Sequence, residues 1–166
     1  MTITGRARAL GDDVNTDYII SSSRKRVTID PKALAPYLLE SIAREFAASV
    51  QAGDLIVAGK NFGCGSAMEV AVTVIQAAGI GAVLAPSFAR SFFRNAINNG
   101  LPVVECDTSF VAEGDGLSIQ IDAGVVVVRN TTSGVVVQAA PMSPIVMNLL
   151  EHGGLVPFLA AHPGWE

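Results

Sequence analysis

The stretch DLIVAGKNFGCGSAME, residues 54–69, decides the fold. Its first five residues form a short apolar run that is typical of a strand buried on both faces. The run ends in a glycine-rich turn over residues 59–65, and Ser66 after it is a favourable helix N-cap. Apolar residues at helical spacing continue to about residue 78, where Gly79 supplies a stop. The pattern therefore predicts a strand, a tight turn and a helix that begins at Ser66.

Outward from this unit, strands and helices continue to alternate. The predicted strands are 3–10, 54–58, 80–85 and 101–105, and the predicted helices after Ser66 are 66–78 and 88–98. Short connections and continuous apolar strands indicate a parallel sheet with helices packed against it. Beyond residue 107, the segments 117–121, 125–129 and 135–139 predict an antiparallel β meander, and a last helix follows from Ser143-Pro144 to Gly153-Gly154. We expect one α/β domain over residues 1–166.

The N-terminal third differs from the rest of the chain in its pattern of polar and apolar residues. Residues 12–30 are polar, with three aspartates between Asp12 and Tyr18, and show no hydrophobic period. We expect a mobile loop with few core anchors there. Asp30-Pro31 then has the pattern of a helix start, with Asp30 as N-cap, and predicts a helix that fades between residues 44 and 49.

Composition excludes several classes of protein. Half of the 166 residues are hydrophobic and the formal net charge is −4, so a nucleic-acid surface is not expected. The N-terminus lacks a signal sequence and no apolar stretch reaches membrane-spanning length, which favours a cytoplasmic protein without a membrane partner. Cys64 and Cys106 are too few for a metal centre, and His152 and His162 lie too far apart in the sequence to suggest a metal pair.

Ser66 has two interpretations. With Glu69 three residues later it forms a capping box, which is a purely structural role. Alternatively its hydroxyl is a base, presented at the end of a strand where ligands bind in α/β sheets, with Gly63 and Gly65 keeping the approach clear. The turn lacks the third glycine of a dinucleotide fingerprint and the Gly-Lys-Ser/Thr of a Walker loop, so phosphate binding is weakly supported.

Four stretches in order resemble the isopropylmalate dehydratase small subunit and the swivelling C-terminal domain of aconitase. They are GDDVNTD at 11–17, DLIVAG at 54–59, NFGCGS at 61–66 with Glu69, and the segment 87–102. The resemblance covers most of residues 5–105, and Gly154-Leu155-Val156 fits the C-terminus of the family. It implies a swivelling β/β/α domain that completes the active site of a two-subunit hydro-lyase of leucine biosynthesis.

The resemblance also implies the chemistry. This chain would bind no cofactor itself, and a large subunit would hold a [4Fe–4S] cluster and share a hydroxy diacid substrate of the 3-isopropylmalate/2-isopropylmalate type. By position, Ser66 would be the base and Asp17 would orient a histidine of the partner. Arg24 or Arg26 would recognise the substrate, while Cys64, Gly65 and Ala67 would line its site. Without the resemblance, Asp17 reads as a local Asx turn and the 24–26 run as a solvated loop.

One departure separates this chain from the family pattern. The usual signature continues Ser-Ser-Arg-Glu-His, whereas here it reads Ser66-Ala67-Met68-Glu69-Val70. A thioether cannot replace the two hydrogen bonds that a guanidinium makes to a carboxylate. Three explanations stay open: an apolar substrate group, another cation from residues 24–26 or the partner, or lost activity. The alternatives are therefore an enzyme for a methylated malate or homoaconitate, or a non-catalytic regulatory domain.

Overall fold

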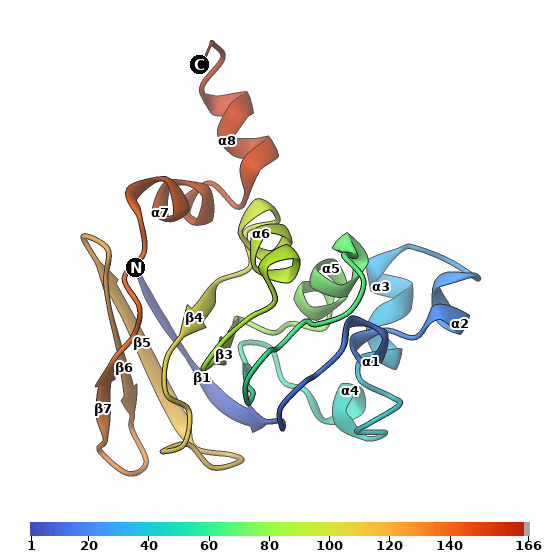
Figure 1. Cartoon of the computed structure of the whole chain (residues 1–166), viewed down its shortest axis with the longest axis horizontal. Coiled ribbons are helices and arrows are strands. Elements are labelled where there is room, and N and C mark those ends of the chain that lie inside the picture. Colours follow the sequence, from blue (N-terminus) through green and yellow to red (C-terminus); the bar gives the residue numbers. More distant parts are fainter. Residues whose placement is uncertain (165–166) are drawn as a thin grey trace.

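The computed structural model describes residues 1–164, so the last two positions of the expected domain lie outside the described residues. Its centre is a curled seven-stranded sheet with the order β4-β3-β2-β1-β5-β6-β7 (Figure 1). The strands are β1 (Thr2–Ala9), β2 (Leu55–Val57), β3 (Ala82–Ala85), β4 (Val103–Glu105), β5 (Gly116–Asp122), β6 (Val125–Asn130) and β7 (Val136–Gln138). Strands β1 to β4 pair in parallel, and β5 to β7 continue antiparallel from β1. The predicted parallel core and β meander are confirmed.

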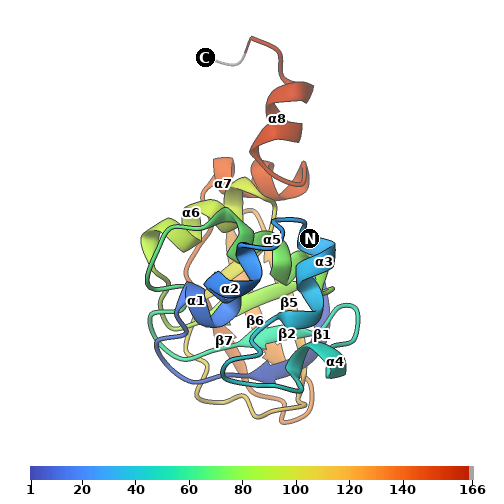
Figure 2. The same cartoon turned by 90° about the vertical axis from the view of Figure 1, so that its right-hand side faces the viewer.

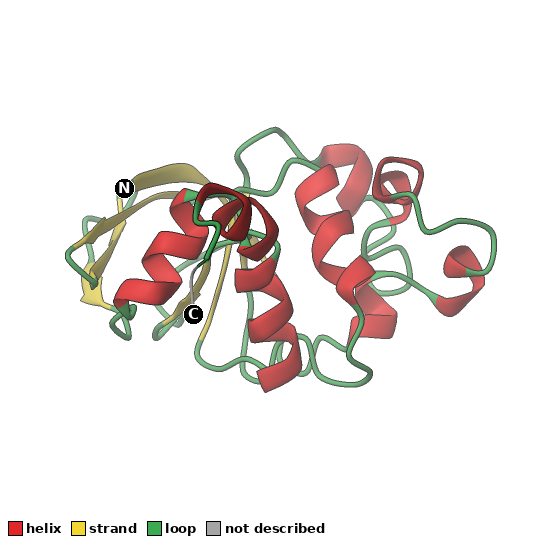
Figure 3. Cartoon of the chain, turned by 90° about the horizontal axis from the view of Figure 1, so that it is seen from above, coloured by secondary structure: helices red, strands yellow, loops and turns green. Residues whose placement is uncertain are grey.

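The parallel strands are buried on both faces. Successive side chains of a strand point to opposite faces, so Ile56 packs with the helices while Leu55 and Val57 pack with Ile119 and Val128 of the meander. Helices α5 (Glu69–Ala77) and α6 (Arg90–Asn98) cover the first face. Figure 3 shows the helices spread beside the strands. The continuous apolar runs of the sequence are the consequence of this double burial.

The N-terminal polar segment is better anchored than its composition suggests. It forms two short helices, α1 (Thr16–Ile19) and α2 (Ser22–Lys25). Val14, Ile19 and Ile20 are buried in the helix-side core, and Thr16 is buried beside them. The expectation of few core anchors was therefore wrong for residues 14–20, where Val14, Ile19 and Ile20 point inward although they are too few to show a period.

The helix expected after Asp30 is broken into pieces. α3 (Pro31–Leu34) begins as predicted, with the Asp30 side chain accepting from the N–H of Lys32, but it runs directly into a 3₁₀ turn, η1 (Ala35–Tyr37). Leu39 then has a φ of 59°, a left-handed conformation that ends the helical path, and α4 (Phe46–Ser49) follows separately. Pro36 lacks the N–H that a continuous helix would need, which accounts for the early break.

The C-terminus holds a helix that the sequence analysis missed. After α7 (Pro144–Glu151), α8 (Leu155–Ala161) projects from the body of the molecule (Figures 1 and 2). Pro157 falls in the first turn of α8, where a missing N–H is tolerated. No single helix among residues 1–164 is long and apolar enough to cross a membrane, and α7 and α8 reach that length only as a pair bent by 89°.

The same bend brings the two histidines together. The rings of His152 and His162 lie 5.1 Å apart, centroid to centroid, and both contact the ring of Phe158. The two histidines are thus neighbours in space although they are distant in the sequence, because the chain bends by 89° between α7 and α8. Each ring Nδ1 is 2.7–2.9 Å from a main-chain carbonyl four residues earlier.

Candidate active site

Three loops meet at the carboxyl edge of the parallel strands. They follow β1, β2 and β3, and because these strands are parallel the loops leave from the same edge. Phe62 donates its N–H to the carbonyl of Ser87 at 3.1 Å, and Ala89 donates to the carbonyl of Phe62 at 2.9 Å. Asn15 and Cys64 form an isolated parallel bridge. This edge is where ligands bind in open α/β sheets.

The first two of these loops bind each other through polar contacts. The carboxylate of Asp12 accepts the N–H of Lys60 at 2.7 Å. The N–H of Thr16 donates to the carbonyl of Cys64 at 2.8 Å. The sequence patterns at 11–17 and 59–66 are therefore two sides of one structure, although more than forty residues separate them.

Glycines allow this close approach. A Cβ at Gly59 would lie 2.7 Å from the main-chain nitrogen of Asp12, and a Cβ at Gly65 would lie 2.6 Å from Oδ1 of Asn15. Gly65 also has a φ of +92°, which side-chain-bearing residues rarely adopt. Larger residues at either position would push the two loops apart.

Ser66 is not a helix cap. Helix α5 begins at Glu69 with Met68 as its N-cap, and no side chain caps it. The Ser66 residue is exposed, and within residues 1–164 its hydroxyl makes no hydrogen bond; only its carbonyl is bound, by the hydroxyl of Thr16 at 2.9 Å. The predicted helix start and capping box were therefore wrong. The chain bends at Gly65 and Ser66, and Met68 is extended ahead of the helix, so Ser66 stays outside the helix with its hydroxyl unbound.

The main chain beside Ser66 carries unused donors. Within the described part of the chain, no acceptor binds the N–H groups of residues 65–68. These groups point their positive ends outward just before the first turn of α5, where the helix dipole adds to their potential. The arrangement suits a ligand or a developing charge that is negative.

Asp17 lies next to this turn with its carboxylate half-exposed. Oδ1 accepts from Nζ of Lys25 at 3.2 Å and from the hydroxyl of Ser22 at 3.1 Å. The hydrogen bond from Lys25, followed by the one from Ser22, lowers the pKa of Asp17 below its ordinary value. The Asx turn here is made instead by Asn15, whose side chain accepts the N–H of Asp17. The side chain of Asp17 is thus left to face solvent and the basic loop.

The basic run 24–26 has three different surroundings. Arg24 makes two hydrogen bonds to the carboxylate of Glu40, at 2.8 and 2.9 Å, and its guanidinium lies 3.6 Å from the ring centroid of Tyr37. Lys25 lies with Nζ 2.6 Å from Sδ of Met68. Arg26 is exposed, and within residues 1–164 its side chain has no hydrogen bond or ion pair. The description as a solvated loop fits Arg26 alone.

Neither cysteine suits an iron–sulfur cluster in this chain. Cys64 is half-buried in the turn, whereas Cys106 is buried beyond β4 among the apolar side chains of the meander. Burial, followed by the charge of Asp107, raises the pKa of Cys106 to about 11, which disfavours the thiolate that a metal needs. Within residues 1–164 no group of three or more His, Cys, Asp or Glu side chains is arranged to hold a metal ion.

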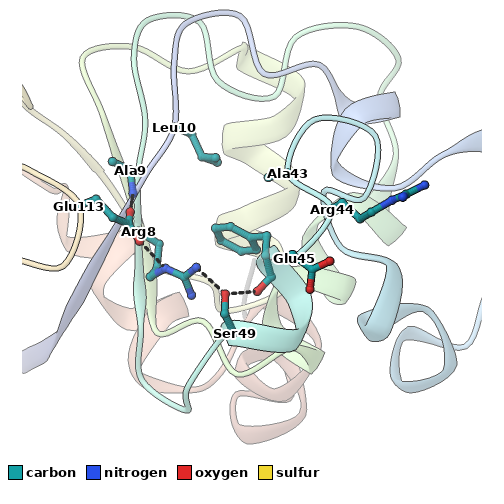
Figure 4. A pocket seen from close by; sticks show the side chains of 9 residues that line it. Arg8, Ala9, Leu10, Ala43, Arg44, Glu45, Ser49 and Glu113 are labelled. Carbon is teal, nitrogen blue, oxygen red and sulfur yellow. Dashed lines mark hydrogen bonds and ion pairs between the residues drawn. The ribbon is translucent and has the colours of Figure 1, made fainter.

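A separate groove of about 360 Å³ lies beside the end of β1 (Figure 4). Arg8, Phe46, Ser49 and Glu113 line it, and none of the residues discussed above does so. Arg8 donates to Ser49 at 2.7 Å and to Glu113 at 2.9 Å, so these three lining side chains bind one another (Figure 4). The groove is therefore distinct from the surface around Ser66.

Thr16 has no assigned role in the sequence analysis, yet it connects the two loops. Its N–H binds the carbonyl of Cys64 and its hydroxyl binds the carbonyl of Ser66. In the sequence, Thr16 is noticeable only because it belongs to the GDDVNTD pattern. That pattern does not show which groups the threonine contacts.

Comparisons with known proteins agree with this fold. Residues 38–108 match the family model described as the aconitase C-terminal domain. The structure of 3-isopropylmalate dehydratase (LeuD) from Methanocaldococcus jannaschii superposes with a TM-score of 0.90 at 42% identity, covering 97% of this chain and 95% of that one. Aconitase X of Thermococcus kodakaraensis shares the fold at a TM-score of 0.50 and 15% identity, over 86% of this chain and 92% of that one. The chain is thus an aconitase-type swivelling domain.

Curated relatives narrow the family further. The 3-isopropylmalate dehydratase small subunit of Moorella thermoacetica is 45% identical over 160 residues, 96% of each chain. Small subunit 1 of the same enzyme from Methanopyrus kandleri is 47% identical over 154 residues, 93% of this chain and 90% of that one. The chain belongs to the 3-isopropylmalate dehydratase small-subunit family and is a subunit of a hydro-lyase.

Proposed function

We propose that this chain is the small subunit of an iron–sulfur-dependent hydro-lyase that dehydrates and rehydrates a hydroxy dicarboxylic acid of the 3-isopropylmalate/2-isopropylmalate type, with Ser66 as the base. The observation that carries the proposal is the Ser66 hydroxyl. It is exposed at the carboxyl edge of the sheet, is not used in a cap, and lies in a run of main-chain N–H groups that have no acceptor among residues 1–164.

The proposed step begins at the carbon next to a substrate carboxylate. Ser66, as the alkoxide, takes the proton from that carbon, and the C–H electron pair forms the new C=C bond. The substrate hydroxyl leaves with its bonding pair and a proton from an acid of the partner, as water. A proton beside a carboxylate is weakly acidic, so groups that stabilise the developing charge lower the barrier. The N–H groups of residues 65–68 are placed to do so.

Asp17 has the properties needed to orient a partner histidine. Its pKa is lowered, which favours the ionised carboxylate, and its side chain is 52% exposed. An ionised carboxylate accepts the N–H of an imidazole and stabilises the protonated ring. We assign Cys64, Gly65 and Ala67 to the lining of the substrate site, Arg26 to substrate recognition, and Arg24 to holding the loop.

The exposure of the site indicates that a large-subunit partner covers it. Ser66, Gly65 and Ala67 are all exposed, and a charge-stabilising site works best where water is excluded. The loop after α2 also exposes apolar side chains, with Val27 at 84% and Ile29 at 76% accessibility. We propose that the large subunit covers this surface and holds the [4Fe–4S] cluster, since the cysteines of this chain do not suit one.

Met68 favours a second candidate substrate. Its thioether lies beside the turn where the family pattern has an arginine, and this suits an acid with a different substituent, such as a methylated malate or homoaconitate. A regulatory domain without catalytic activity has no comparable observation in its favour.

The test is an anaerobic co-purification with the candidate large subunit, followed by hydration and dehydration assays on 3-isopropylmalate, a methylated malate and homoaconitate. Because a positioned base contributes roughly 10²- to 10⁴-fold, Ser66→Ala is expected to lower kcat by about that factor while the complex still forms. Ser133→Ala, an exposed serine in the β6–β7 turn, serves as the matched control and is expected to leave kcat unchanged.

The outcomes separate the candidates. Turnover that is lost in Ser66→Ala supports the hydro-lyase, and the preferred acid identifies the substrate. A stable complex without turnover on any of the three acids overturns the catalytic proposal, and turnover that survives in Ser66→Ala removes Ser66 from the base role.

A further inference from the structure

The ammonium group of Lys25 lies against Met68, the residue at which the family pattern has an arginine. Nζ of Lys25 is 2.6 Å from Sδ of Met68, although the two residues are 43 apart in the sequence. Met68 follows the candidate base Ser66 by two residues. The same Nζ is 3.2 Å from Oδ1 of Asp17, whose neighbour Thr16 binds the carbonyl of Ser66.

The surroundings of Lys25 leave part of its binding capacity unused. An ammonium group has three donors, and here one faces a carboxylate and one faces a thioether, which is a weak acceptor. The side chain is only 15% exposed, so its charge is less screened than that of a surface lysine. A carboxylate that replaced the contact with sulfur would gain a charge-assisted hydrogen bond.

The loop holds Lys25 in this place before any ligand arrives. Lys25 is the last residue of α2, and Arg24 beside it is fixed by its two hydrogen bonds to Glu40 and its stacking on Tyr37. Met68 adapts to the lysine because its side chain is unbranched and flexible. Lys25 and Met68 therefore act together. Helix α2 supplies the cation that the turn carrying Ser66 and Met68 lacks.

We propose that Lys25 binds a carboxylate of the substrate, in place of the arginine missing at position 68, and so determines specificity. This rests on the proposed function. A lysine presents a point charge and not a planar fork, so it binds one carboxylate oxygen. The thioether of Met68 then provides an apolar wall beside that carboxylate, which suits a hydroxy diacid with an aliphatic substituent.

The test uses steady-state kinetics of the assembled two-subunit enzyme with its preferred acid. Loss of a hydrogen bond to a charged group predicts that Lys25→Ala raises KM by about 10- to 100-fold, with a much smaller effect on kcat. Lys25→Gln, which keeps the length of the side chain, is expected to show the same rise. Lys32→Ala, an exposed lysine on α3, is the control and is expected to leave KM unchanged.

Rescue distinguishes substrate binding from a structural role. In the double variant Lys25→Ala/Met68→Arg, the new arginine occupies the space of both side chains. It is expected to bring KM most of the way back to the wild-type value. Because an arginine in that space could also pair with Asp17, amide hydrogen exchange of residues 21–29 is measured beside KM. A lysine that only orders the loop predicts faster exchange in Lys25→Ala, whereas a lysine that binds substrate predicts a raised KM with exchange unchanged. Complex formation and thermal unfolding of each variant confirm that the fold is retained.

The outcomes also separate this proposal from the proposed function. If the wild-type enzyme turns over and both Lys25→Ala and Lys25→Gln keep the wild-type KM, the assignment of Lys25 is overturned. The hydro-lyase proposal is not affected by that result. A rise in KM that Met68→Arg does not rescue likewise overturns it. A wild-type complex without turnover on any acid rejects both.

Discussion

Arg24, Lys25 and Arg26 are consecutive cations with three distinct environments. Arg24 is engaged by Glu40 and Tyr37, Lys25 by Asp17 and Met68, and Arg26 faces solvent. From the sequence, Arg24 and Arg26 were equal candidates for substrate recognition. The contacts of Arg24 favour a supporting role, because a guanidinium held by two hydrogen bonds and a ring is already committed.

At this scale, Arg24→Met is expected to loosen the loop without touching the chemistry. Removing the ion pair and the stacking contact should speed amide hydrogen exchange in residues 21–29 and raise KM several-fold with kcat little changed. Glu40→Gln should do the same from the other side, while Arg129→Met, an exposed arginine on β6, should do neither. Exchange rates and kinetics that stay at wild-type values in both loop variants would show that Arg24 does not order this segment.

At the scale of elements, the loops after β1 and β2 function as one structure. The contact between residues 11–17 and 59–66 depends on main-chain atoms that approach where side chains are absent. Local sequence shows that these segments are turns, because glycine and aspartate favour turns. It does not show that they face each other, since that depends on the parallel pairing of β1 with β2.

Two glycines on opposite sides of this contact make a matched pair for mutation. A Cβ at Gly59 would collide with the main chain of Asp12, whereas a Cβ at Gly11 would meet nothing within 4 Å. Overpacking of this kind costs about 1–3 kcal/mol, so Gly59→Ala is expected to lower the free energy of unfolding by that amount and Gly11→Ala by much less. Urea denaturation of both variants measures the difference. Equal effects would mean that the two loops can separate at little cost.

At the scale of the whole molecule, a buried ion cluster joins distant parts of the chain. Asp54, with only 3% of its side chain exposed, accepts hydrogen bonds from Arg6 and Arg8 of β1 and from the N–H of Gln51. Burial alone would raise the pKa of Asp54, but the hydrogen bonds from Arg6, Gln51 and Arg8 outweigh it and the pKa is lowered from its ordinary value of 3.8. The cluster fixes β1 against the segment that leads into β2.

The sign of the pH dependence follows from the lowered pKa. Asp54 binds protons less readily when folded, so its contribution to stability is complete above about pH 4 and is lost as pH falls through the folded pKa. Breaking a buried pair costs roughly 3 kcal/mol, so Asp54→Asn is expected to lower the free energy of unfolding by about that much at pH 7. Denaturation curves at pH 7 and in the acid range should show that this variant loses less stability than the wild type on acidification.

An exposed member of the same cluster provides the control. Glu113 also pairs with Arg8, but 58% of its side chain is exposed. Surface ion pairs contribute about 0–1 kcal/mol, so Glu113→Gln is expected to change stability little. If the two variants were equally destabilised, burial would not be what makes Asp54 important.

The sequence by itself determined the class of fold, the positions of all seven strands and the family signature around Ser66. These features are local, because strand burial, turn residues and motif order are readable within short windows. The sequence-based predictions were wrong where helices begin or break. Ser66 has the pattern of a cap but lies ahead of α5, Pro36 breaks a predicted helix, and α8 follows Gly154 where no further helix was predicted.

The composition of the site was decided by the tertiary structure alone. Lys25 meets Met68, Arg24 meets Glu40 and Thr16 meets Ser66 only after the parallel strands bring their loops to one edge. Such contacts depend on how each loop packs against the others, and no local periodicity records this. The sequence shows that an arginine is missing at position 68, and only the packed chain shows which cation lies beside the residue that replaced it.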